Sequence, residues 1–82
     1  MTLAKELLDI INVDFNQTEK EFVIAQLASI ELEHMMAESE YNLRSTRLAI
    51  LKLAKGNLDD VIELTKNAKV DFRDVIMWAS EI

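Results

Sequence analysis

The chain has 82 residues, half of them hydrophobic, with one glycine, no proline, no cysteine and a formal net charge of −6. That length allows one small domain, residues 1–82, and the missing cysteines exclude disulfides, thiolate metal sites and thiol catalysis. An acidic chain without a basic groove is a poor candidate for nucleic-acid binding, because neutralised phosphates supply most of that affinity.

The composition predicts an all-α fold, since strands and their turns would need more glycine and more β-branched alternation. A core of this size adds little net stability. In the absence of disulfides, oligomerisation is the usual further source of stability for so small a domain. The N-terminal residues lack a basic region followed by a long apolar run, and no apolar run is long enough to cross a membrane. We therefore expect a cytoplasmic protein without a signal peptide.

The first predicted element is a short helix from Leu3 to about Ile11, with Thr2 as its cap. Residues 12–16, Asn-Val-Asp-Phe-Asn, are rich in side chains that stop helices. We therefore expect a turn at these positions.

The second predicted element is a long helix. Thr18 and Glu21 match the capping box that starts a helix, and residues 22–55 contain neither glycine nor proline. Helix propensity is weakest at residues 39–42, but the apolar pattern continues through them in phase, which favours one continuous helix to Lys55. Gly56 then supplies the left-handed C′ residue.

Apolar residues of this long helix form two stripes on opposite sides. One stripe comprises Val23, Leu27, Ile30, His34, Ala37, Tyr41 and Leu48. The other comprises Ala25, Ala28, Leu32, Met35, Met36, Ser39, Leu43, Thr46, Ile50 and Leu53. A helix with two apolar faces must be packed from both sides. We therefore predict a long-helix hairpin with a short N-terminal helix over one end, and dimerisation of two hairpins into a four-helix bundle.

The last predicted element is a C-terminal helix capped by Asn57, with acidic residues in its first turn and apolar residues recurring every three or four positions to Ile82. The unbroken period favours one helix. The alternative is a break at Val70 and Asp71, in which Asp71 caps a further helix and Val70 packs on Val75.

Charges indicate how two copies would meet. Residues 31–40 hold four glutamates, and residues 44–55 hold four basic side chains and no acidic one. Two antiparallel copies crossing near Asn42 would set acidic segments against basic ones and so fix their register. The alternative is an intrahelical pair between Glu40 and Arg44. The predicted interface residues are Leu32, Met35, Met36, Leu43, Arg44, Arg47 and Ile50.

One histidine could take part in a metal site. Glu31 and His34 form a Glu-x-x-His pattern, and Glu38 follows one turn later on the same helix face. Carboxylate-bridged metal bundles collect their ligands with this spacing. The alternative, which we favour, is a packed interface histidine that is hydrogen-bonded to a neighbouring glutamate.

Other catalytic patterns are missing: the sequence has no phosphate-binding glycine loop, no nucleophile elbow and no second histidine. We expect no enzyme activity and no cofactor, and we expect a homodimeric protein–protein interaction or regulatory module. A metal-binding bundle and a structural subunit of a larger complex are the alternatives. Trp78, beside Met77, either closes the end of the bundle or serves as a docking residue.

The C-terminal third also carries two motifs, Gly-Asn-Leu-Asp at residues 56–59 and Asp-Phe-Arg-Asp-Val-Ile-Met-Trp-Ala at residues 71–79. They are similar to those of a group of small uncharacterised bacterial proteins with a Gly-Asp-Leu start and an Asp-Tyr-Arg-Asp-Val-Leu-x-Trp-Ala ending. Asn57, Phe72 and Ile76 are the departures from that pattern. The resemblance implies a bacterial source and a helical fold, and no function.

Overall fold

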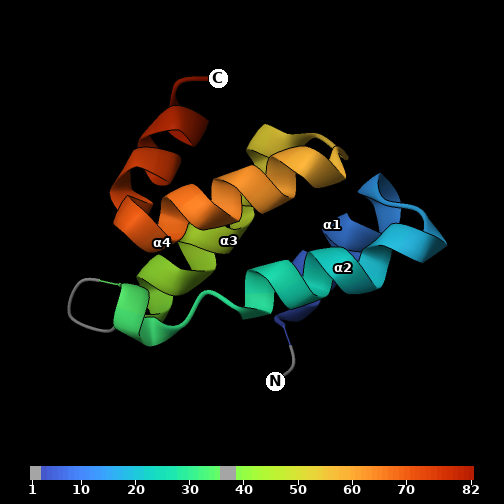
Figure 1. The fold of residues 1–82 in the computed structure, drawn as a ribbon, viewed down its shortest axis with the longest axis horizontal. Helices are drawn as coiled ribbons and strands as arrows, with labels where there is room; N and C mark the ends of the chain where they lie inside the picture. The colour runs from blue at the N-terminus through green and yellow to red at the C-terminus, as the bar shows by residue number, and fades with distance from the viewer. Residues whose placement is uncertain (1–2, 36–38) are drawn as a thin grey trace.

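A computed structural model of the chain describes residues 3–35 and 39–82. It confirms the all-α fold class, with no strand among these residues (Figure 1). The elements in chain order are α1 (Lys5–Asp14), α2 (Gln17–Ala28), the 3₁₀ helix η1 (Leu32–His34), α3 (Glu40–Ala54) and α4 (Leu58–Ser80).

The helices pack as two consecutive pairs around one core. Short connections join α1 to α2 and α3 to α4, and the helices of each pair lie against each other. The pairs are joined because α4 also packs on α2 and η1, and α1 packs on α3. The largest fully buried apolar side chains are Leu7, Ile11, Val23, Leu27, Ile30, Ile50, Leu51, Val61 and Val75.

Helix α1 is longer at its C-terminal end than the sequence predicts. Residues 12–14 stay helical, and the amide of Phe15, just past the helix, donates to the carbonyl of Ile11 at 3.0 Å. The Phe15 side chain is buried in the core. Burial of this ring outweighs the weak helix propensity of the polar residues before it. The helix begins at Lys5, with Ala4 at the N-cap, so the predicted start at Leu3 is wrong. The predicted cap, Thr2, lies outside the described residues.

Helix α2 begins before the predicted capping box. The side chain of Asn16 accepts from the amide of Glu19 at 3.0 Å and from the Thr18 hydroxyl at 2.7 Å. Asn16 is therefore the N-cap, and Thr18 lies within the first turn. Asparagine is at least as good a cap as threonine, and Asn16 directly follows the buried Phe15.

The prediction of one continuous helix to Lys55 is wrong. Helix α2 ends at Ala28, and α3 begins only at Glu40, where the Ser39 hydroxyl caps it by accepting from the amide of Asn42 at 3.1 Å. The low-propensity residues at 39–42 are thus the start of a new helix. Because the chain changes direction between α2 and α3, residues of both apolar stripes enter the core of a single chain.

Arg47 stabilises the break between α2 and α3 through hydrogen bonds. Its Nε donates to the carbonyl of Leu27 at 3.0 Å and its Nη2 to that of Ile30 at 2.9 Å. These carbonyls lie at the C-terminal end of α2, where a helix leaves acceptors unpaired and favours positive charge. The Arg47 side chain is buried, with an exposed fraction of 7%, and this burial lowers the pKa of its guanidinium.

The turn between α3 and α4 follows the sequence prediction. Lys55 and Gly56 both have left-handed backbone angles, with φ of 49° and 84°. Gly56 also lies against α1, because a Cβ at this position would come within 2.8 Å of the Asp14 carbonyl oxygen. The side chain of Asn57 accepts from the amide of Asp60 at 3.0 Å, which confirms Asn57 as the cap of α4.

Helix α4 is interrupted at Asp71, whose φ of −154° and ψ of 100° are not helical. The Asp71 carboxylate accepts from the amide of Arg73 at 3.1 Å and from its guanidinium at 3.0 Å. The alternative reading with a capping Asp71 therefore describes α4 better than one straight helix does. Its expected contact between Val70 and Val75 is wrong, since Val70 is 88% exposed and Val75 is buried.

Candidate functional site

Glu31 and His34, the first two residues of the predicted metal site, do lie together. Nδ1 of His34 accepts from the amide of Glu31 at 2.9 Å, and the Glu31 side chain accepts in return from the amide of His34. The pair is a capping box that starts η1. Glu38 lies outside the described residues. Within residues 3–35 and 39–82, no cluster of three or more His, Asp or Glu side chains could hold a metal ion.

Most of the predicted dimer interface belongs to the core of the single chain. Met35, Leu43, Arg47 and Ile50 are buried, and Leu32 is half-buried. The four buried side chains therefore offer no exposed face for a second copy in this fold. Met36 lies outside the described residues.

Arg44 is exposed, and its partner is within the chain. Its Nε donates to the carboxylate of Glu6 on α1. This pair connects α1 to α3, a contact that the sequence pattern did not indicate. The predicted intermolecular register required a continuous helix, so the break between α2 and α3 removes its basis.

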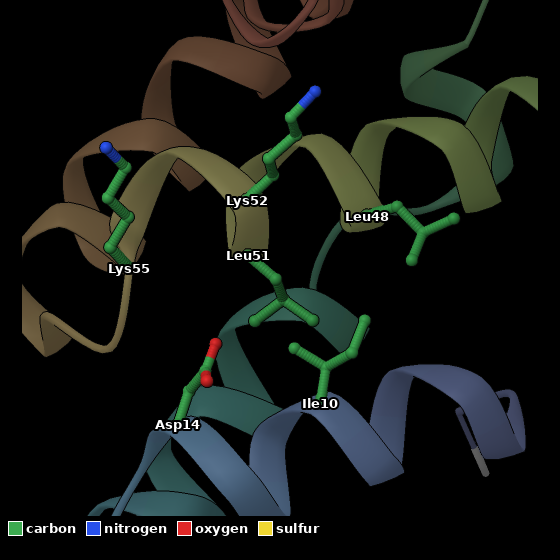
Figure 2. A pocket seen from close by; sticks show the side chains of 6 residues that line it. All are labelled: Ile10, Asp14, Leu48, Leu51, Lys52 and Lys55. Carbon is green, nitrogen blue, oxygen red and sulfur yellow. The ribbon is translucent and has the colours of Figure 1, made fainter. Parts of the chain in front are cut away.

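A hollow with a volume of about 550 Å³ lies between α1 and α3. Figure 2 shows Ile10 of α1 and Leu51 of α3 pointing toward each other across it, with Leu48 farther along α3. Asp14 lies at the end of α1, and Lys52 and Lys55 extend outward from α3. We call this hollow the α1–α3 cleft. It combines an apolar floor with charged side chains at its edges.

Helix periodicity places Ile10, Leu48, Leu51, Lys52 and Lys55 on helices but does not bring them together. Ile10 and Leu51 are more than forty positions apart in the sequence. The cleft exists because the chain folds back between α2 and α3 and sets α1 beside α3. The only signal in the sequence was the apolar character of residues 10, 48 and 51.

Several large apolar side chains are exposed outside the cleft. Tyr41 at the start of α3 is 79% exposed, and Phe22 on α2 is 64% exposed. Trp78, near the C-terminal end of α4, keeps 38% of its surface exposed and has the exposed Met77 beside it. Part of the Trp78 side chain is therefore covered by the protein, and part is open to solvent.

No helix in the described part of the chain is long and apolar enough to span a membrane. Comparison of the chain with protein-family models, curated proteins and solved structures finds no match.

Proposed function

We propose that this protein is a protein–protein interaction module that self-associates and acts as a small adaptor or regulator. The observation that carries the proposal is the α1–α3 cleft, with its apolar floor and its charged edge.

The cleft has the chemistry of a site for an amphipathic helix. Leu51 on α3 is buried and points toward Ile10 of α1, and Leu48 lies one helical turn before it, so Ile10 and Leu48 are the half-buried apolar side chains that the cleft offers a partner. Apolar anchors of a partner helix, spaced three or four residues apart, would fit such a floor. Lys52 and Lys55 would favour acidic residues beside those anchors, and Asp14 would restrict where they could lie.

Self-association has separate support in the exposed apolar side chains. Aromatic residues contribute strongly to protein interfaces, and Phe22, Tyr41 and Trp78 all present surface to solvent. A chain of this length without disulfides also gains stability from oligomerisation.

The cleft can be tested by placing a photo-crosslinking amino acid at position 48 and, as a control, at the exposed position 66 on α4. We expect position 48 to capture one defined protein in cells and position 66 not to capture it. The double variant Lys52→Glu with Lys55→Glu should abolish that capture. Equal capture from both positions, or capture that the double variant leaves unchanged, would refute a docking role for the cleft.

Self-association is tested by native mass spectrometry and sedimentation equilibrium at low micromolar concentration. We expect a dimer without bound metal. A stable monomer would refute this part of the proposal, and a dimer with stoichiometric metal would favour the site at Glu31 and His34 instead.

A further inference from the structure

The last turns of α4, which follow the break at Asp71, are buried on one side only. Phe72, Val75 and Ala79 are buried and hold this segment on the core. The opposite side is exposed, and helical spacing brings four of its residues together. We call this side the α4 face, and it comprises Asp74, Met77, Trp78 and Glu81. The α4 face is open to another molecule.

The α4 face combines large apolar side chains with negative charge. Met77 and Trp78 expose apolar surface, and both residue types are enriched in protein interfaces. Asp74 and Glu81 lie between them around the helix and form no ion pair among the described residues. Carboxylates in this position favour a partner with positive charge at the edge of an apolar surface.

The α1–α3 cleft is complementary to the α4 face in both respects. It offers the half-buried side chains of Ile10 and Leu48, in a hollow of about 550 Å³ that has room for an indole ring. Lys52 and Lys55 extend outward at its edge (Figure 2), and neither forms an ion pair within the described part of the chain. Asp14, at the end of α1, would repel the carboxylates of the α4 face and so direct them toward α3.

We propose that the α1–α3 cleft binds the α4 face of a second copy of this chain. The two apolar side chains of the α4 face would cover Ile10 and Leu48, and its two carboxylates would approach Lys52 and Lys55. The inference rests on the proposed docking role of the cleft and on the proposed self-association, and it specifies both.

The α4 face cannot fill the cleft of its own chain. The residues that line the cleft belong to α1 and α3, whereas the buried side of the last turns of α4 fixes the α4 face outward. Figure 1 shows these last turns, in red, at the edge of the molecule and apart from α1. Two copies related by a two-fold axis would fill both clefts reciprocally, which closes a dimer.

This arrangement couples self-association to partner binding. A helix from another protein would need the same apolar floor that the second copy covers. Such a helix must therefore displace the α4 face, and its binding would dissociate the dimer.

Charge reversal tests the contact from each side. The cleft variant carries Lys52→Glu with Lys55→Glu, and the face variant carries Asp74→Lys with Glu81→Lys. Each variant alone sets like charges against each other in both contacts of its dimer. We expect the dissociation constant of the dimer to rise about tenfold or more in each, as sedimentation equilibrium would show.

A mixture of the two variants should restore the dimer. The glutamates in the cleft of the cleft variant then meet the lysines of the face variant, and the second contact keeps the charges of the unchanged protein. Misfolding of either variant would not be reversed by mixing. The matched control carries Lys66→Glu with Lys69→Glu, the same change in charge at exposed positions of α4. It should dimerise like the unchanged protein and should not restore association of the face variant.

Trp78 supplies a second measurement, because it is the only tryptophan of the chain. Its fluorescence emission should move to shorter wavelength as the concentration rises through the dissociation constant of the dimer, since the second copy covers the indole ring. The cleft variant leaves Trp78 unchanged and should abolish this shift. The control variant should keep it.

The outcomes separate this contact from self-association as such. Weak association of each variant alone, with recovery in the mixture, supports docking of the α4 face. A dimer that neither reversal weakens, a mixture that does not recover, or a dimer that forms without a change in Trp78 emission overturns it and leaves self-association standing. A monomer at all concentrations overturns both, and the crosslinking at position 48 then decides separately whether the cleft binds another protein.

Discussion

The guanidinium of Arg47 donates from Nη2 to the main-chain carbonyl of Ile30 at 2.9 Å, across seventeen positions of the sequence. Its Nε donates to the carbonyl of Leu27 at 3.0 Å, so one side chain of α3 pairs two carbonyls where α2 ends. The contact uses the positive charge of arginine where the dipole of α2 is negative. It is the main described polar link between the two helix pairs.

We expect Arg47→Met to lower the free energy of unfolding by about 3 kcal/mol, because it removes the guanidinium that donates to the Ile30 carbonyl and adds a second donor to the Leu27 carbonyl. Arg44→Met is the matched control, since the exposed pair of Arg44 with Glu6 is worth at most about 1 kcal/mol. Urea unfolding followed by circular dichroism measures both values. Equal effects of the two substitutions would contradict the role given to Arg47.

We expect Gly56→Ala to destabilise the protein by at least about 1 kcal/mol, because its φ is positive and a Cβ would lie 2.8 Å from the Asp14 carbonyl oxygen. Lys55→Gly should instead be neutral or stabilising, since glycine adopts its left-handed φ of 49° without strain. Thermal melts of both variants test this contrast. A neutral Gly56→Ala would argue against the close contact with α1.

The buried Thr65 hydroxyl has no hydrogen-bond partner among the residues that the structure describes. Thr65→Val removes this unpaired group and keeps the shape, so we expect a gain of about 1 kcal/mol in stability. Thr46→Val is the control, because the Thr46 hydroxyl donates to the Asn42 carbonyl at 2.7 Å and its loss should cost about 1 kcal/mol. Chemical denaturation should therefore give opposite signs for the two threonines.

Stability should depend on pH through Asp71. The hydrogen bond from the Arg73 side chain holds the pKa of the Asp71 carboxyl below its ordinary value of 3.8. The folded state therefore binds this proton less readily than the unfolded state, and the stabilisation, present above 3.8, is lost as the pH falls through the lower folded pKa. Asp71→Asn should remove this contribution and shift the amide resonance of Arg73, as a pH titration by NMR would show. If the Asp71→Asn variant loses stability with falling pH in the same way as the unchanged protein, the contribution of Asp71 is contradicted.

The helix ends were predictable where one local signal acts alone. Gly56 and Asn57 mark the turn between α3 and α4 through backbone angle and side-chain capping, and both act within a few residues. The low propensity at residues 39–42 was also a correct signal. It marks the start of α3, which Ser39 caps, because an apolar period that continues in phase does not require a continuous helix.

The candidate site was less predictable than the fold. Glu31 and His34 of the Glu-x-x-His pattern lie together, and their hydrogen bonds are those of a helix start. The α1–α3 cleft could not be read from any spacing, since its two walls come from helices that are distant in the sequence.

The sequence by itself determined the all-α class, the turn at Gly56 and the cap at Asn57, because composition and short-range hydrogen bonding decide these features. The tertiary structure alone decided where α2 ends, which way α3 runs and that α1 lies beside α3. The apolar period of a sequence indicates which side chains are buried but not what covers them. A long helix with two apolar faces and two helices of a chain that folds back on itself therefore show the same pattern. The choice between them depends on long-range contacts such as those of Arg47, whose energy appears only when both helices are in place.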